Sequence, residues 1–67
     1  MRVDEIYTEL FGLYGGYMSV HSLATFLRVD DPQAKALLDG LRVLPIGKRK
    51  KYRTRDVARR LAYREES

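Results

Sequence analysis

A run of cationic residues interrupts an apolar pattern in the second half of the chain. The apolar segment 43–46 (Val-Leu-Pro-Ile) is followed by Gly47, and Tyr52 returns to an apolar position after the run. An apolar segment, a glycine and a second apolar segment are typical of a short β-hairpin. We therefore predict a hairpin over residues 43–53. Its tip carries the cationic residues Lys48, Arg49, Lys50 and Lys51.

The distribution of charge along the chain is strongly uneven. Residues 42–67 carry ten Lys or Arg and three Asp or Glu, a net charge of +7, whereas residues 1–41 have a net charge of −3. Cations held together on a turn repel one another unless the phosphates of a polyanion lie between them. The hairpin is thus predicted to contact nucleic acid. The alternative is that these charges only solvate a very small domain.

The length and composition limit the possible classes of protein. A chain of 67 residues forms one domain, here residues 1–67, and buries only about 60% of its unfolded surface. The absence of cysteine excludes disulfides and thiolate metal sites. The sequence has neither an apolar run of about 20 residues nor a signal-peptide core, so we expect no membrane contact. The expected location is cytoplasmic and nucleoid-associated.

The N-terminal segment has a broad apolar face. Apolar residues recur at helical spacing, and Gly15 and Gly16 follow them, which predicts a helix over residues 3–14. The residues of this face are Val3, Ile6, Tyr7, Leu10, Phe11 and Tyr14. Because the face is wide for so small a domain, two interpretations stay open. It packs entirely on the domain, or part of it serves another copy of the chain or a recombinase.

Two further helices are predicted close together, over residues 20–28 and 32–41. Ser19 is a good cap for the first, and Asp31 followed by Pro32 suits the start of the second. Two short amphipathic helices joined by three residues form a helix-turn-helix, here residues 20–41. The outward residues of the second helix are candidate DNA contacts, because Gln can read adenine, Lys can reach guanine or phosphate, and Ala can touch a thymine methyl. These candidates are Gln33, Lys35 and Ala36.

The chain closes with a basic helix. Thr54 is predicted to cap a helix over residues 55–65, which carries a narrow apolar stripe. Arg53 and Arg55 flank this cap and join the predicted DNA-binding residues. The predicted fold class is therefore mainly α with a small β-hairpin.

Two stretches resemble a known family. Residues 18–29 (Met-Ser-Val-His-Ser-Leu-Ala-Thr-Phe-Leu-Arg-Val) are similar to the start of the winged helix-turn-helix of phage and transposon excisionases, which is related to MerR-type DNA-binding domains. Residues 45–57 resemble the wing of that family, which runs apolar-Gly-basic-basic-Tyr-Arg before a capped helix. The residue that ends the first helix is commonly Gly in the family and is Arg28 here. The resemblance implies a winged helix-turn-helix with an extra N-terminal helix.

The expected function is binding of double-stranded DNA. The resemblance implies an excisionase-like recombination directionality factor, or a small transcription regulator of a phage or mobile element. The alternative is a protein-protein interaction module, such as a phage-encoded inhibitor, whose basic face meets an acidic partner. No nucleophile–base set, metal-ligand cluster or phosphate-binding loop is present, so we expect no enzyme activity, cofactor, metal or small-molecule substrate.

Overall fold

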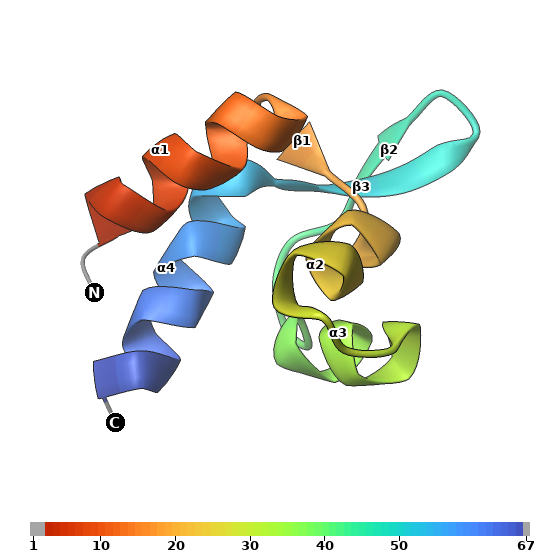
Figure 1. Cartoon of the computed structure of the whole chain (residues 1–67). Helices are drawn as coiled ribbons and strands as arrows, with labels where there is room; N and C mark the ends of the chain where they lie inside the picture. Colours follow the sequence, from red (N-terminus) through yellow and green to blue (C-terminus); the bar gives the residue numbers. More distant parts are fainter. Residues whose placement is uncertain (1–2, 67) are drawn as a thin grey trace.

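The computed structural model describes the backbone of residues 3–66 and the side chains of residues 3–63. Residues 1–2 and 67 of the predicted domain lie outside the described residues. The described chain is mostly helical with a small antiparallel sheet, an arrangement compatible with a winged-helix-like fold (Figure 1). The elements in chain order are α1 (Val3–Tyr14), β1 (Tyr17–Met18), α2 (Val20–Leu27), α3 (Asp31–Leu37), β2 (Leu44–Ile46), β3 (Arg49–Arg53) and α4 (Thr54–Glu66).

Strand β3 is the centre of the sheet, whose order is β1-β3-β2. The predicted hairpin is formed by β2 and β3, with Ile46 opposite Arg49. Its turn consists of Gly47 and Lys48, and Gly47 has a φ of 64°, as a type II′ turn requires at its first central residue. The placement of all four cations on the turn is corrected: only Lys48 lies there. Because two residues suffice for the turn, the other three cations belong to β3.

Helix α1 has the predicted bounds and packs against α4. Ile6 and Leu10 of its apolar face are buried, and they join one core cluster with residues from every other helix and from β1 and β3. Phe11, which the sequence assigned to the same face, is half exposed. Most of this face is therefore covered within the molecule. The buried members of the core are Ile6, Leu10, Met18, Leu23, Ala24, Ala34, Leu38, Tyr52, Val57, Ala58 and Ala62.

Thr54, at the start of α4, is hydrogen-bonded to the two glycines that follow α1. It is fully buried, its hydroxyl donates to the carbonyl of Gly15 at 2.6 Å, and its backbone N–H donates to the carbonyl of Gly16 at 2.9 Å. The prediction that Thr54 precedes and caps the last helix is wrong, because α4 begins at Thr54 itself. The hydroxyl is used instead to tie the start of α4 to the connection that follows α1.

The helix-turn-helix segment differs from its prediction at the turn. Helix α2 ends at Leu27, since Arg28 adopts the left-handed conformation with a φ of 59°. The cap of α3 is Asp30 and not Asp31, because the Asp30 carboxylate accepts from the backbone N–H of Gln33 at 2.9 Å. Helix α3 also ends at Leu37, four residues before the predicted end.

The early end of α3 has a local cause and a distant one. Gly40 has a φ of 86°, which an α-helix cannot accommodate and which glycine adopts readily. In addition, the Arg60 guanidinium donates to the carbonyls of Leu37 and Asp39, which holds the chain in its turn beyond the helix. The apolar spacing that extended the predicted helix to residue 41 continues through this turn. There the backbone N–H groups of Leu38, Asp39 and Leu41 donate to carbonyls three residues back, the tighter 3₁₀ pattern, and not four residues back as in an α-helix.

We expect Thr54→Val to lower the free energy of unfolding by about 2 kcal/mol, because the carbonyl of Gly15 loses a hydrogen bond in a buried place. Thr54→Ser is the matched control, since it keeps the hydroxyl and removes only a methyl group, at a cost of about 1 kcal/mol. Urea unfolding followed by circular dichroism measures both. If Val were tolerated better than Ser, packing of the methyl would matter more than the hydrogen bond.

Arg28→Gly is expected to raise the free energy of unfolding by about 0.5 kcal/mol. A left-handed residue with a side chain costs about 1–2 kcal/mol, and the greater chain entropy of glycine offsets part of the gain. Arg28→Val removes the same charge but should destabilise the fold by about 1 kcal/mol or more, because a β-branched residue is strained there. A glycine variant less stable than the wild type would show that the Arg28 side chain itself contributes to stability.

Candidate nucleic-acid interface

An open groove of about 520 Å³ lies between the start of α3 and the hairpin. Lys35 reaches it from α3 and Lys50 from β3. Lys50 is there because side chains alternate along a strand, so it shares a face with Tyr52, whose ring is buried in the core. The structure therefore brings together two cations that are fifteen positions apart in the sequence. The residues that line the groove are Val20, Asp31, Pro32, Lys35, Lys50 and Tyr52.

The groove continues onto the outer surface of α3. A second, smaller hollow of about 380 Å³ is lined by Pro32, Lys35, Ala36 and Asp39, so it shares Pro32 and Lys35 with the groove. Lys35 and Ala36 are exposed. Two of the three predicted base-contact residues, Lys35 and Ala36, are thus accessible on one continuous surface.

Gln33 has a structural role that its prediction as a base reader did not include. Its side-chain oxygen accepts from the backbone N–H of Asp30 at 3.3 Å, while Asp30 accepts from the backbone N–H of Gln33. This reciprocal pair is a capping box at the start of α3. A bidentate contact with adenine needs the amide oxygen as well as the amide nitrogen, so it would compete with the cap.

Strand alternation separates the remaining predicted cations. Arg49, Lys51 and Arg53 lie on the face of β3 opposite Lys50 and Tyr52. Lys48, at the turn, lies at the far end of the hairpin from the helices (Figure 1). Arg55 lies apart from the hairpin, with its guanidinium carbon 5.7 Å from the ring centre of Tyr7 on α1. At that distance the cation interacts with the face of the ring.

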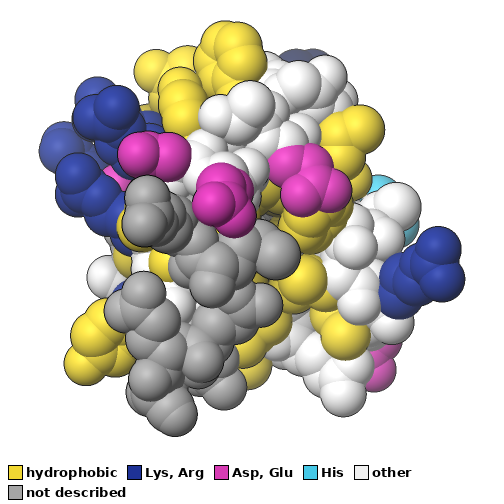
Figure 2. All heavy atoms as spheres, turned by 60° about the vertical axis from the view of Figure 1, so that its left-hand side comes forward, with side chains coloured by type: hydrophobic (Ala, Val, Ile, Leu, Met, Phe, Trp, Pro, Cys, Tyr) yellow, Lys and Arg dark blue, Asp and Glu magenta, His cyan; other side chains and the backbone are white. Residues whose placement is uncertain are grey.

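Positive charge is also present away from the hairpin. Figure 2 shows the α1 and α4 side of the molecule, where Lys and Arg side chains gather at one edge next to acidic side chains, with hydrophobic side chains at the top. The groove between α3 and the hairpin differs from this edge because it is hollowed and its two cations, Lys35 and Lys50, come from two different elements.

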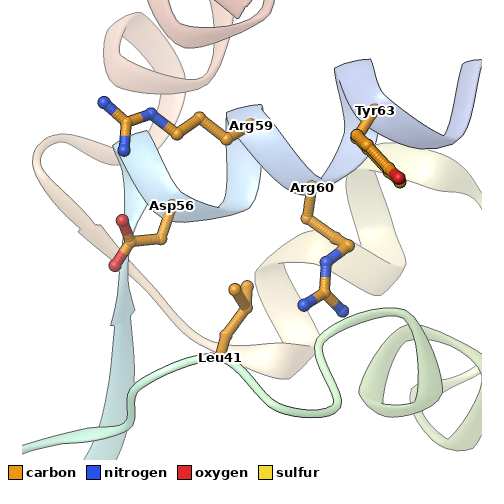
Figure 3. A pocket seen from close by; sticks show the side chains of 5 residues that line it. All are labelled: Leu41, Asp56, Arg59, Arg60 and Tyr63. Atoms are coloured by element: carbon orange, nitrogen blue, oxygen red, sulfur yellow. The ribbon is translucent and has the colours of Figure 1, made fainter. Parts of the chain in front are cut away.

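Arg60 positions α3 and is not one of the predicted site residues. Figure 3 shows it in a hollow lined by Leu41, Asp56, Arg59, Arg60 and Tyr63, with its guanidinium directed to the chain that follows α3. One of its nitrogens donates to the carbonyl of Leu37 at 3.0 Å and to that of Asp39 at 2.7 Å. A cation at these last carbonyls also interacts favourably with the helix dipole. No local sequence signal reveals this contact, because the partners are more than twenty residues apart.

Asp31 lines the groove, although it was predicted to be the cap of α3. Two consecutive aspartates precede Pro32, and either could have been the cap of α3. Since Asp30 is the cap, the Asp31 carboxylate stays exposed in the groove, 3.3 Å from Nδ1 of His21. It places a negative charge beside Lys35 and Lys50.

No family model, no curated protein and no solved structure matches the chain. Among the described residues, no helix combines the length and apolarity that a membrane span needs. The same residues contain no group of three or more side chains suited to hold a metal ion. The groove between α3 and the hairpin is therefore the feature from which a function can be inferred.

Gln33→Ala should lower the free energy of unfolding by about 0.5 kcal/mol, because the backbone N–H of Asp30 loses its partner in the cap. Gln33→Glu is the matched variant: it keeps an acceptor oxygen and adds a negative charge at a helix N-terminus, which is favourable. Urea unfolding of the three proteins tests this order. If Ala and Glu were equally stable, the capping role of Gln33 would be contradicted.

Proposed function

We propose that this protein binds double-stranded DNA, with α3 at the major groove and the hairpin against the adjoining backbone. The observation that supports this is the groove in which Lys35 of α3 and Lys50 of β3 lie on one surface. A helix fits the major groove, which is about 12 Å wide. A hairpin beside that helix would act as the wing of a winged helix-turn-helix.

The composition of this surface favours binding through phosphates. Lys35 and Lys50 are exposed and are the cations of this surface, and Lys48 is exposed at the turn of the hairpin, while Ala36 offers only an apolar contact to a thymine methyl. Phosphate contacts fix the position and orientation of a protein on DNA but carry no sequence information. We therefore expect appreciable binding to any duplex, with a modest additional preference that comes from α3.

The resemblance to excisionases extends the proposal to a biological role. A recombination directionality factor and a small transcription regulator of a phage or mobile element both need a compact protein that occupies a defined duplex site. Footprinting on the DNA that flanks the gene separates these two roles. A tandem protected site would favour recombination, and a protected promoter would favour regulation.

The binding proposal is tested by fluorescence anisotropy with a labelled duplex at several salt concentrations. Log affinity should fall with log salt by about 0.9 for each phosphate contact. The double variant Lys35→Gln/Lys50→Gln should weaken binding and reduce that slope by about 2, because about 1 is lost with each phosphate contact. Asp31→Asn should strengthen binding, since it removes a carboxylate from the groove.

A control with the same loss of charge makes the test specific to the groove. Arg49→Gln/Arg53→Gln removes two cations from the opposite face of the sheet and should reduce affinity and slope much less. Equal losses in the two double variants would mean that only net charge matters and that the groove is not the binding surface. A lack of duplex binding by the wild type at low salt would contradict the proposed function itself.

A further inference from the structure

The sheet has a second face, directed away from α2 and α3. In an antiparallel sheet, residues directly opposite one another on neighbouring strands share a face. The cations on this face of β3 are therefore each beside an apolar or aromatic residue of a flanking strand: Arg49 beside Ile46, Lys51 beside Leu44, and Arg53 beside Tyr17. We call these six residues the outer sheet face.

The outer sheet face is accessible. Ile46 and Tyr17 are 41% and 45% exposed, and Arg49 and Arg53 are exposed as well. Figure 1 shows α2 and α3 on the other side of the hairpin, with no helix over its outer side. Large apolar side chains in this position stay in contact with water unless a partner covers them.

The chemistry of this face indicates what would cover it. Its three cross-strand pairs hold three cations and no carboxylate, so the charge that complements it is negative. Phosphates alone would neutralise the cations but would leave Ile46 and Leu44 without apolar contacts. A surface that offers carboxylates and apolar side chains together would satisfy both kinds of residue.

The free edge of β2 is poorly suited to pairing with an additional strand. Pro45 lies in the middle of this three-residue edge strand and has no backbone N–H to donate. Proline in such a position interrupts the row of donors and acceptors that an added strand would need. A partner would consequently bind across the face through side chains, and not along the edge through the backbone.

We propose that the outer sheet face is a docking surface for a partner protein segment that presents carboxylates next to large apolar side chains. Cations two positions apart on β3 are about 6.6 Å apart along the strand. An extended partner segment has the same repeat and turns every second side chain to this face. Two carboxylates four positions apart can therefore face Arg49 and Arg53, while an apolar side chain midway between them covers Leu44 and Ile46. This surface lies on the face of β3 opposite Lys50, so docking there does not depend on DNA binding in the groove.

The probe is a short synthetic peptide in which Glu and Leu take turns at every second position and Ser fills the positions between, so that Glu and Leu lie on one face of the extended chain. It is titrated into the ¹⁵N-labelled 67-residue protein. Amide shift changes should be saturable and centred on Tyr17, Ile46 and Arg49. A matched peptide with Ser for every Leu should bind about tenfold more weakly, as expected for the loss of one buried Leu side chain. A peptide with Lys for every Glu should not bind.

Two double variants on opposite faces of β3 make the test specific. Arg49→Gln/Arg53→Gln should weaken peptide binding about fivefold, which corresponds to the loss of two exposed ion pairs. Lys35→Gln/Lys50→Gln, which has the same net charge, should leave peptide binding unchanged and should affect DNA binding instead. Retention of the wild-type amide spectrum shows that each variant is folded.

Three results would overturn the proposal. Peptide-induced shifts centred on α3 would place the binding in the groove. Equal binding of the Leu and Ser peptides, or equal weakening by both double variants, would reduce the interaction to non-specific charge attraction. Shifts of the outer sheet face on addition of a duplex, with none on addition of the peptide, would assign the face to nucleic acid. Loss of DNA binding alone would contradict the DNA proposal and leave this one intact.

Discussion

The two hydrogen bonds of Thr54 are the constraint on which the rest of the structure depends. They link the start of α4 to the carbonyls of Gly15 and Gly16, thirty-nine and thirty-eight positions earlier in the chain. The same contact brings β1 beside β3, where Tyr17 is opposite Arg53. A small domain has few buried contacts, so each one contributes a large share of its stability. The hydrogen bonds of the buried Thr54 therefore fix how α1, the sheet and α4 are arranged.

Strand β3 gives this small molecule two different surfaces. Lys50 and Tyr52 are directed to the helices, so Lys50 faces the groove beside α3, whereas Arg49, Lys51 and Arg53 are directed to the outer sheet face. The period of two along a strand is sufficient to separate these groups. A continuous cationic run can therefore supply one surface suited to phosphates and another suited to acidic protein segments.

Net charge alone overstates the positive surface that is available to a partner. Arg60 uses its guanidinium to hold the end of α3, and Arg55 lies against the ring of Tyr7. In the groove, Asp31 offsets part of the charge of Lys35 and Lys50. The fold thus uses the side chains of Arg55 and Arg60 in internal contacts, and the net charge of the sequence does not by itself locate the surface that a polyanion would contact.

The sequence by itself determined the features that depend on neighbouring residues. The apolar period and Gly15 predicted the bounds of α1, Ser19 predicted the start of α2, and Gly47 predicted the hairpin turn, because each signal acts within one turn of helix or strand. It predicted Asp31 as the cap of α3, and this was wrong, because the adjacent Asp30 is an equally suitable residue and is the cap. The tertiary structure alone decided the roles of Thr54 and Arg60 and the meeting of Lys35 and Lys50 in one groove. Those outcomes depend on contacts between residues distant in the chain, which no local pattern encodes.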